Sequence, residues 1–441
     1  MEDVTVLILA GGDSSRLWPL TNKHTLTFLS KPLIWYSLSQ LVRNGMERVI
    51  IVVSRGNKQQ IQQVANEFSS LSVKLVEQHD PRGMAGATLS GAGEIADTRL
   101  LILGPSDIYE DILWSGFKKL LHDDPPGIIA GTTVETYFPG GYLTIVNNEV
   151  KGIVEKPDPK EVPSQFVTFG FYYFRSSSHF LSTLNEQKGQ EDDLFEKALE
   201  VYFKGNRIQF LPYKGYWGYV KYPWHVLTLT GHFLGKIKGK TIKKAVVAQT
   251  ATISGDVYIE DGVRVLDHAS IVGPTYIGRG SVVGNNALVR ESMIGGHSVV
   301  GFSTEIVRSW VGEGCWFHSN YIGDSVISDN VAFGAGAMTA NFRLDEGIVY
   351  STILGKKIES GRVKLGSVIG ENVRIGVNAS IMPGVKIGKN TSVSAGICIT
   401  RDIDDDSFCI PKVGNYKVLK NKRPVEKSSV RATVLNNLTK K

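Results

Sequence analysis

The chain has 441 residues, of which 42% are hydrophobic and 21% charged, and its net charge is +6. This length predicts two or three domains, and the composition is ordinary for a soluble globular protein. No apolar run reaches about 18 residues, so we expect no transmembrane helix and no membrane partner. The amino terminus lacks a basic signal region and the three cysteines are widely spaced, which favours free thiols in the cytoplasm.

The first apolar segment, Val4 to Ala10, is rich in β-branched residues and predicts a buried strand. Gly11 and Gly12 follow it, and because they carry no Cβ, backbone N–H groups there can approach an anionic ligand. Arg16 can bind phosphate oxygens through its planar guanidinium, and Lys23 adds a positive charge. This segment therefore predicts a nucleoside triphosphate site rather than an ordinary strand-to-helix turn.

Two other phosphate-binding loops are excluded. A dinucleotide site requires G-x-G-x-x-G and an acidic residue after the second strand. Here the third glycine is missing, and the second predicted strand ends in Ser54-Arg55. The sequences typical of P-loops, zinc enzymes and α/β hydrolases are also missing.

Residues 1 to about 235 alternate predicted strands and helices, which favours a largely parallel sheet covered on both faces. Ligands of such sheets bind beyond the carboxyl ends of the strands. Gln78 follows one strand there, and its amide can pair with a pyrimidine edge. Asp107 follows another and suits Mg2+. The alternatives are a surface glutamine and an aspartate that caps a helix.

A basic linker, residues 236–246, separates this region from an internal repeat with a period of six residues. Aliphatic residues recur at Ile253, Ile259, Val265, Ile271, Ile277, Val283 and Val289, and later at Ile369, Ile375, Ile381, Ile387, Val393 and Ile399. One short strand and one tight turn per repeat, stacked into a parallel β-helix, fit this period. We expect the β-helix at residues 247–410 and a basic, solvated tail at 411–441. The tail contains no known nucleic-acid-binding module, so no nucleic-acid partner is expected.

The repeat is interrupted twice, and interruptions of a solenoid are where functional residues tend to lie. The first interruption contains His318 and Tyr321. The second contains Asn341 and leads into an insertion that ends near Leu365. A histidine titrates near neutral pH and suits the task of a general base. The alternative for His318 is a polar corner residue of a coil.

The segment from Val6 to Pro32 resembles the signature of the sugar-1-phosphate nucleotidylyltransferases, L-A-G-G-x-G-T-R-L followed by P-K and K-P. The spacing of Arg16, Lys23 and Lys31 resembles that of the bifunctional members, which join uridylyl transfer to acetyl transfer and make UDP-N-acetylglucosamine. This resemblance extends over nearly the whole chain. It implies a Rossmann-like nucleotidyltransferase domain at 1–235, followed by a left-handed parallel β-helix that forms homotrimers.

The resemblance also implies the substrates and the site residues. The substrates would be a nucleoside triphosphate, a sugar 1-phosphate and acetyl-CoA, with Mg2+ held by Asp107. The implied catalytic residues are Arg16, Lys23 and His318. The implied nucleotide-binding residues are Leu9, Ala10, Gly11, Gly12, Gln78 and Gly83. The implied sugar-binding residues are Gly141, Glu155 and Thr168, and those of the acetyl-transfer site are Tyr321 and Asn341.

The chain departs from the family pattern at several of these places. Ser14 and Ser15 replace a glycine and a threonine of the signature, and Asn22 replaces the proline before Lys23. Tyr219 replaces the aspartate that is the second metal ligand, and a phenol with a pKa near 10 cannot replace a carboxylate on Mg2+. Other replacements are Met84 for threonine, Ser106 and Lys221 for glycines, and Val307, Gly347 and Tyr350 for lysines.

Two functions remain open at this point. The first is a bifunctional enzyme that transfers a nucleotidyl group from UTP or dTTP to a sugar 1-phosphate and acetylates an amino-sugar phosphate, with the nucleotidyl half impaired. The second is a catalytically inactive sensor of sugar nucleotides, that is, a regulatory or scaffolding subunit. Tyr219 and Ser14 favour the sensor, whereas the retained Arg16, Lys23 and Asp107 favour the enzyme.

Overall fold

A computed structural model of the chain describes residues 3–189, 193–412 and 415–422. The contacts between residues divide the chain into two compact units. The first unit comprises Met1–Asp13, His24–Leu26 and Pro32–Tyr219, and the second comprises Ser14–Lys23, Thr27–Lys31 and Val220–Lys441. In the described part of the chain, no helix has the length and apolar character needed to cross a membrane.

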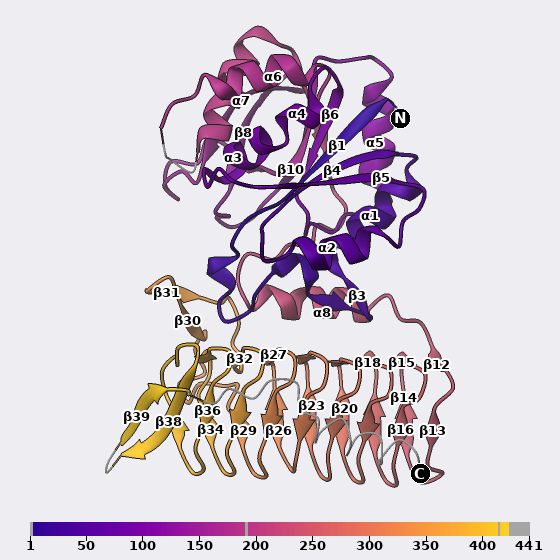
Figure 1. Cartoon of the computed structure of the whole chain (residues 1–441), viewed down its shortest axis with the longest axis vertical. Helices are drawn as coiled ribbons and strands as arrows, with labels where there is room; N and C mark the ends of the chain where they lie inside the picture. The colour runs from indigo at the N-terminus through magenta and orange to yellow at the C-terminus, as the bar shows by residue number, and fades with distance from the viewer. Residues whose placement is uncertain (1–2, 190–192, 413–414, 423–441) are drawn as a thin grey trace. The chain divides into compact units, whose positions relative to one another are not determined.

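The first unit is built on a nine-stranded sheet with the order β5-β4-β1-β6-β10-β7-β11-β9-β8 (Figure 1). Its strands are β1 (Val4–Ala10), β4 (Arg48–Val53), β5 (Ser72–Glu77), β6 (Arg99–Leu103), β7 (Gly127–Thr133), β8 (Gly141–Val146), β9 (Glu149–Glu155), β10 (Phe166–Phe174) and β11 (Ile208–Pro212). The first four strands of this order are parallel, as predicted, but β10 runs antiparallel to both β6 and β7. The carboxyl ends of β1, β5 and β6 therefore lie at one edge of the sheet.

Helices cover both faces of this sheet, and successive residues of β1 pack against helices on opposite faces. Val6 and Ile8 pack with α1 (Leu33–Arg43), α2 (Lys58–Ala65) and α5 (Asp111–Leu121). Leu7 packs on the opposite side. The helices on that side are α3 (Gly83–Ser90), α4 (Ala92–Ile95), α6 (Ser177–Asn185) and α7 (Leu194–Gly205). The predicted α/β domain is confirmed.

The second unit contains α8 (His225–Leu234) and a parallel β-helix made of three sheets (Figure 1). One sheet holds β12 (Lys240–Ile242), β15 (Val257–Ile259), β18 (Thr275–Ile277), β21 (Met293–Ile294), β24 (Trp310–Val311), β27 (Val326–Ile327), β32 (Val368–Ile369) and β35 (Lys386–Ile387). The next holds β13 (Val246–Val247), β16 (Arg264–Val265), β19 (Val282–Val283), β22 (Val299–Val300), β25 (Trp316–Phe317), β28 (Ala332–Phe333), β33 (Arg374–Ile375), β36 (Ser392–Val393), β38 (Ser407–Lys412) and β39 (Asn415–Lys420). The third holds β14 (Thr252–Ser254), β17 (Ser270–Val272), β20 (Leu288–Arg290), β23 (Glu305–Val307), β26 (Tyr321–Gly323), β29 (Met338–Thr339), β34 (Ser380–Ile381) and β37 (Cys398–Ile399).

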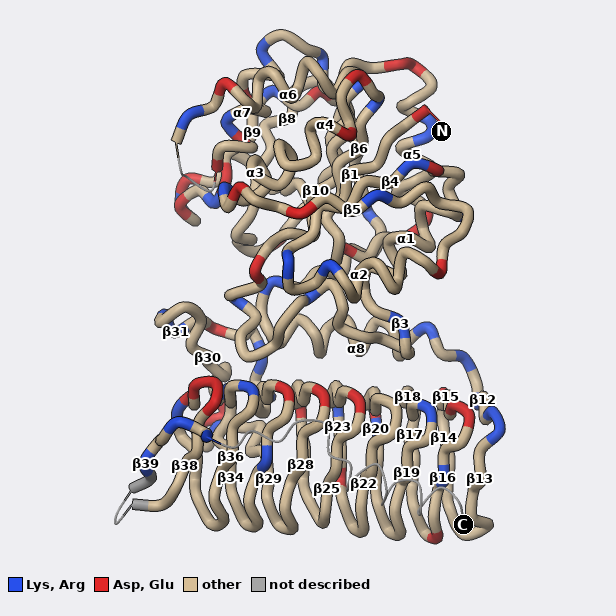
Figure 2. Tube along the Cα trace, in the orientation of Figure 1, with Lys and Arg blue, Asp and Glu red and all other residues tan. Residues whose placement is uncertain are grey.

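The six-residue repeat predicted this architecture because each inward aliphatic residue stacks on its equivalent in the next coil. Ile271 pairs with Val289, Val289 with Ile306, and Ile306 with Ile322, and all four are fully buried. Charged residues are concentrated along one long edge of the coils (Figure 2). The aliphatic residues therefore form one continuous apolar core.

The first predicted interruption is a shortening of the coils. Hydrogen-bonded positions in adjacent coils are 18 residues apart at His268 and Thr250, but 16 apart at Asn320 and Thr304. The buried side chain of Asn320 closes the tightened turn, since its Nδ2 donates to the carbonyl oxygens of Gly334 at 2.8 Å and Ala337 at 2.9 Å. This shorter coil is the one that carries the predicted histidine.

The second predicted interruption is an insertion after β29. Strand β27 pairs directly with β32, so that Val326 faces Val368 although a long segment separates them in the chain. The inserted segment forms the antiparallel hairpin of β30 (Tyr350–Ile353) and β31 (Lys356–Glu359). The solenoid continues regularly on the other side of the insertion.

The carboxyl-terminal tail differs in part from the prediction. We expected a solvated tail from residue 411, but β39 pairs antiparallel with β38, with Val418 opposite Cys409. Val418 packs against the solenoid core, and this aliphatic residue among lysines explains why the segment is held there. Of the remaining tail, residues 413–414 and 423–441 lie outside the described part of the chain.

Asparagine side chains form a ladder along one corner of the solenoid. Asn330 Nδ2 donates to Asn372 Oδ1 at 2.7 Å, and Asn372 Nδ2 donates to Asn390 Oδ1 at 3.0 Å. Asn390 Nδ2 in turn donates to Asp406 Oδ1 at 2.9 Å. All four residues have left-handed backbones, with φ between 53° and 61°. Asparagine and aspartate tolerate this conformation better than other non-glycine residues. These residues therefore fit the left-handed turns, and their side chains are hydrogen-bonded to one another from coil to coil.

Substituting the middle of this ladder, Asn372→Ala, is expected to lower the free energy of unfolding by about 1–3 kcal/mol, because two neighbours lose hydrogen bonds and alanine is strained at positive φ. Asn286→Ala is the matched control, since Asn286 has the same left-handed backbone (φ 58°) outside the ladder. Denaturant unfolding of both variants measures the difference. An equal loss in the two would assign the whole effect to the backbone.

Candidate functional site

The predicted nucleotide-binding residues of the first unit lie at the carboxyl ends of β1 and β5. Ala10 is held in place by Asn57, whose Nδ2 donates to its carbonyl oxygen at 2.8 Å, and Leu9 precedes it in the same strand. The Gln78 side chain covers Gly11 so closely that a Cβ at Gly11 would collide with Gln78 Oε1. Only glycine fits at this position.

The Gln78 amide is oriented by the loop that follows β5. Its Nε2 donates to the carbonyl oxygen of Asp80 at 2.6 Å and reaches that of Gly83 at 3.5 Å. Its Oε1 is buried and accepts no hydrogen bond from the described residues. A buried acceptor without a donor costs about 1–3 kcal/mol, and a ligand N–H would remove that cost. The structure thus brings Gly11, Gln78 and Gly83 together around an acceptor that no described residue satisfies.

The three predicted sugar-binding residues also lie together. Gly141 on β8 is the strand partner of Glu155 at the end of β9. A Cβ at Gly141 would lie 3.0 Å from Cγ2 of Thr168, which is on β10. The carboxylate of Glu155 is held by Lys156, with Oε1 and Nζ 3.0 Å apart. Glu155 and the buried Thr168 therefore lie on the two strands next to Gly141, where the close contacts leave no room for a Cβ.

Asp107 follows β6, where the sequence predicted a metal ligand. Its Oδ1 accepts a hydrogen bond of 2.9 Å from the indole Nε1 of Trp217. A Cβ at Gly104 would collide with its Oδ2, so the carboxylate lies tightly over the end of the strand. The described residues contain no group of three or more histidine, cysteine, aspartate or glutamate side chains that could hold a metal. Asp107 thus provides one carboxylate beyond the end of β6, and Mg2+ can be held by one carboxylate together with substrate phosphates.

Tyr219 lies in an aromatic cluster next to this carboxylate. Its ring centroid is 4.7 Å from that of Trp217 and 5.3 Å from that of Phe138. Burial raises the pKa of Tyr219, which keeps the phenol neutral. A neutral phenol packed among aromatic rings cannot supply the second negative oxygen of a two-carboxylate metal site.

A buried hydrogen bond beside Asp107 escaped the sequence analysis. Ser106 Oγ lies 2.6 Å from His24 Nδ1, and both side chains are buried. The pair connects the residue before Asp107 with the residue after Lys23. The only sequence signal was Ser106 itself, which stands where the family has glycine, because nothing in the pattern singled out His24.

The predicted catalytic cations Arg16 and Lys23 belong to the second unit. Arg16 lies in a 3-10 helix, Ser15–Leu17, and Lys23 begins another, Lys23–Thr25. Ser14, which precedes the first of these helices, has a left-handed backbone (φ 56°). Glycine adopts this conformation without strain, so serine is a costly substitute at this position.

The residues predicted for acetyl transfer lie on the shortened coil of the solenoid, which carries His318 and Tyr321, and on the next coil, which carries Asn341. Tyr321 begins β26, and its hydroxyl accepts a hydrogen bond of 3.1 Å from Asn341 Nδ2. His318 precedes Tyr321 by three residues, in the turn between β25 and β26, and its side chain is exposed. The buried side chain of Asn320 fixes this turn by accepting a hydrogen bond from the backbone N–H of His318. The structure therefore joins Tyr321 to Asn341 and leaves the imidazole of His318 accessible.

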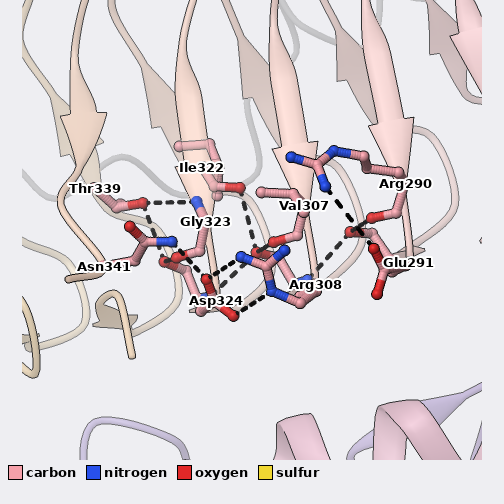
Figure 3. Close-up of polar contacts among 12 residues, drawn as sticks. Arg290, Glu291, Val307, Arg308, Ile322, Gly323, Asp324, Thr339 and Asn341 are labelled. Atoms are coloured by element: carbon pink, nitrogen blue, oxygen red, sulfur yellow. Dashed lines mark hydrogen bonds and ion pairs between the residues drawn. The ribbon is translucent and has the colours of Figure 1, made fainter. Parts of the chain in front are cut away.

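An ion pair that the sequence analysis did not single out lies next to Asn341, with Asp324 between Asn341 and Arg308 (Figure 3). Arg308 donates from Nε to Oδ1 and from Nη2 to Oδ2 of Asp324, each at 2.7 Å. This contact raises the pKa of Arg308. The only sequence signal was the place of Asp324 in the first interruption, three residues after Tyr321, since its partner lies 16 residues earlier.

Comparison with known proteins finds a matching family model in each of the two parts of the chain. Residues 5–220 match the nucleotidyl transferase family model, and residues 367–401 match the hexapeptide repeat of succinyl-transferase. The chain is thus a nucleotidyltransferase domain joined to a hexapeptide-repeat β-helix. Over part of its length it is similar in fold to a UDP-glucose pyrophosphorylase complexed with UDP-glucose, with a TM-score of 0.44 and 23% identity, covering 49% of this chain and 92% of that chain.

Two relatives match nearly the whole chain. It is 32% identical over 417 residues to the bifunctional sugar-1-phosphate nucleotidylyltransferase/acetyltransferase of Sulfurisphaera tokodaii, covering 91% of this chain and 98% of the relative. It is 31% identical over 416 residues to the bifunctional protein GlmU of Methanococcus maripaludis (strain C5), covering 92% and 97%. The chain belongs to the family of bifunctional sugar-1-phosphate nucleotidylyltransferase/acetyltransferases, which confirms the family expected from its signature segment.

Proposed function

We propose that this protein is a transferase with two activities. Its nucleotidyltransferase domain joins a nucleoside triphosphate, UTP or dTTP, to a sugar 1-phosphate, and its β-helix acetylates an amino-sugar phosphate with acetyl-CoA. The observation that carries the proposal is the shortened coil, where Tyr321 is hydrogen-bonded to Asn341 of the next coil and the accessible His318 lies three residues before Tyr321. The names of its relatives support the same pair of activities.

In the nucleotidyl half, Gln78 and Gly83 bind the base, and Leu9, Ala10, Gly11 and Gly12 provide backbone groups for the phosphates. Gly141, Glu155 and Thr168 bind the sugar. A phosphate oxygen of the sugar phosphate forms a bond with the α-phosphorus of the triphosphate, and pyrophosphate leaves with the electrons of the broken bond. Arg16 and Lys23 neutralise the phosphates during this step. Mg2+, when bound at Asp107, supplies further charge neutralisation.

In the acetyl half, His318 is the general base. It removes a proton from the amino group of the sugar, whose nitrogen forms a bond with the thioester carbonyl carbon of acetyl-CoA. The carbon–sulfur bond then breaks, and CoA leaves as a thiol after protonation. Tyr321 and Asn341 bind the acceptor sugar.

The proposal extends to assembly and location. We assign nucleotidyl transfer to residues 1–235 and acetyl transfer to the β-helix, whose sheets extend into the predicted linker at β12 and into the predicted tail at β39. The β-helix forms a homotrimer, and the protein works in the cytoplasm without a nucleic-acid or membrane partner. Three free cysteines support a reducing compartment, namely Cys315, Cys398 and Cys409.

A second function is favoured by the aromatic cluster. Because Tyr219 packs against Trp217 and Phe138, the first unit is suited to hold a sugar nucleotide without a complete metal site. In this case the first unit is a sensor of sugar nucleotides, and the chain is a regulatory or scaffolding subunit.

One panel of assays tests both functions. Purified protein is given UTP, dTTP, GTP or ATP with glucose, glucosamine or N-acetylglucosamine 1-phosphate and Mg2+, and pyrophosphate release is measured. Acetyl transfer from acetyl-CoA to glucosamine 1-phosphate is measured in parallel as CoA release. Turnover in both assays supports the bifunctional enzyme. Binding of a UDP-sugar without Mg2+ and without pyrophosphate release supports the sensor.

A further inference from the structure

A chain of polar contacts leads from Arg308 through Asp324 to Asn341 (Figure 3). The side chain of Asp324 is only 4% exposed, and it forms an ion pair with Arg308. It accepts two hydrogen bonds of 2.7 Å from Arg308 and one of 2.5 Å from Asn341 Nδ2. A buried carboxylate is stable only when it is paired in this way, so its partners are held firmly.

These contacts set the orientation of the Asn341 amide. Its Nδ2 carries two hydrogens, and the two acceptors that face it are Asp324 Oδ2 and the Tyr321 hydroxyl oxygen. Its Oδ1 points away from Asp324 (Figure 3). A flipped amide would place Oδ1 against the carboxylate, where two acceptors would repel each other. Asn341 is therefore held as an acceptor toward a ligand.

The same contact determines what Tyr321 can do. Its hydroxyl oxygen already accepts the hydrogen bond from Asn341, so its own proton is available to a ligand acceptor. Gly323 makes this arrangement possible, because a Cβ there would lie 2.6 Å from Asn341 Nδ2 and 2.7 Å from the Tyr321 hydroxyl. The Asn341 amide oxygen can thus accept a hydrogen bond from a ligand, and the Tyr321 hydroxyl can donate one.

We propose that Asp324, held by Arg308, is a positioning residue that fixes the hydrogen-bond polarity of the acceptor-sugar site, so that Asn341 accepts from an N–H or O–H group of the amino sugar and Tyr321 donates to one of its oxygens. This inference rests on the proposed acetyl transfer. Asp324 itself does not touch the substrate. Arg308 pairs with both carboxylate oxygens, and the oxygen that faces Asn341 accepts its hydrogen bond, which is why the amide has a single orientation.

Asp324→Asn tests the inference with almost no change of shape. An asparagine at this position can donate as well as accept, so Asn341 is no longer restricted to one orientation. The KM for glucosamine 1-phosphate is expected to rise about tenfold, while kcat stays within about threefold, because His318 is not altered. The KM for acetyl-CoA is expected to stay unchanged. An unchanged KM for glucosamine 1-phosphate would overturn the inference.

Two further variants separate positioning from a merely structural role. Asp402→Asn is the matched control, because Asp402 is another ion-paired aspartate of the same solenoid, 3.5 Å from Lys386 Nζ, and it should leave both KM values unchanged. Arg308→Lys retains a cation beside Asp324, so its KM for glucosamine 1-phosphate should remain closer to wild type than that of Asp324→Asn. Thermal unfolding of each variant gives the structural effect. Equal changes of kcat and both KM values, accompanied by a lower unfolding temperature, would overturn the positioning role.

Calorimetric binding of glucosamine 1-phosphate distinguishes failure of the inference from failure of the proposed function. If wild type binds this probe but does not acetylate it, the proposed activity is wrong, and a weaker affinity in Asp324→Asn still supports the inference. If wild type acetylates the probe and Asp324→Asn matches it in KM and affinity, the activity stands and the inference is wrong. Absence of both binding and acetylation in wild type would overturn both.

Discussion

The variant His318→Gln is expected to lower the kcat of acetyl transfer by about 10²–10⁴-fold, the usual contribution of a general base. The imidazole lies in an exposed turn of the shortened coil, and Asn320 holds the backbone there. Glutamine retains polarity and approximate size but cannot accept the proton of the sugar amine. The measurement is CoA release at saturating acetyl-CoA and glucosamine 1-phosphate.

The control for this variant is His268→Gln, which replaces another exposed histidine of the solenoid, in an earlier coil. It should retain the wild-type rate. Nucleotidyl transfer should be the same in both variants, because the proposed residues of that half do not include either histidine. If His318→Gln kept more than half of the acetyl-transfer rate, His318 would be a corner residue of the coil, and the proposed base would be wrong.

The β-helix was predictable because every coil needs the same kind of residue at the same inward positions. Every coil must place an aliphatic residue inside, and the stacked residues Ile271, Val289, Ile306 and Ile322 meet that requirement at a nearly constant spacing. The sheet of the first unit was predictable only in part. The apolar runs indicated its strands. The antiparallel direction of β10, however, depends on the path of the long segment that precedes it, and the periodicity of apolar residues carries no information about that path.

The candidate site was predictable at the level of single residues but not of their partners. The Trp217–Asp107 hydrogen bond joins residues 110 positions apart, and the Arg308–Asp324 pair joins neighbouring coils. Both residues of the second pair have left-handed backbones, which direct their side chains, and no local pattern reveals that direction. Val418 shows the same limit, since a strand was not expected among the lysines of the tail.

Replacing Tyr219 by aspartate is expected to raise pyrophosphate release in the presence of Mg2+ by about 10²–10³-fold, the usual effect of one charged contact in a transition state. Trp217 connects the two positions, because its indole N–H donates to Asp107 and its ring packs on Tyr219. A carboxylate at 219 would give the metal a second negative oxygen. Loss of the aromatic contacts should lower the free energy of unfolding by about 1–3 kcal/mol.

Tyr219→Asn is the control for this gain, because asparagine removes the same ring and has nearly the size of aspartate, but carries no charge. Both variants should lose similar stability, and only Tyr219→Asp should gain activity, with a dependence on Mg2+ concentration. A further change, Ser14→Gly, should add to the gain, because glycine relieves the left-handed backbone at φ 56°. If Tyr219→Asp released pyrophosphate no faster than Tyr219→Asn, the missing carboxylate would not be what limits this half. A UDP-sugar that still bound to both variants would then favour the sensor.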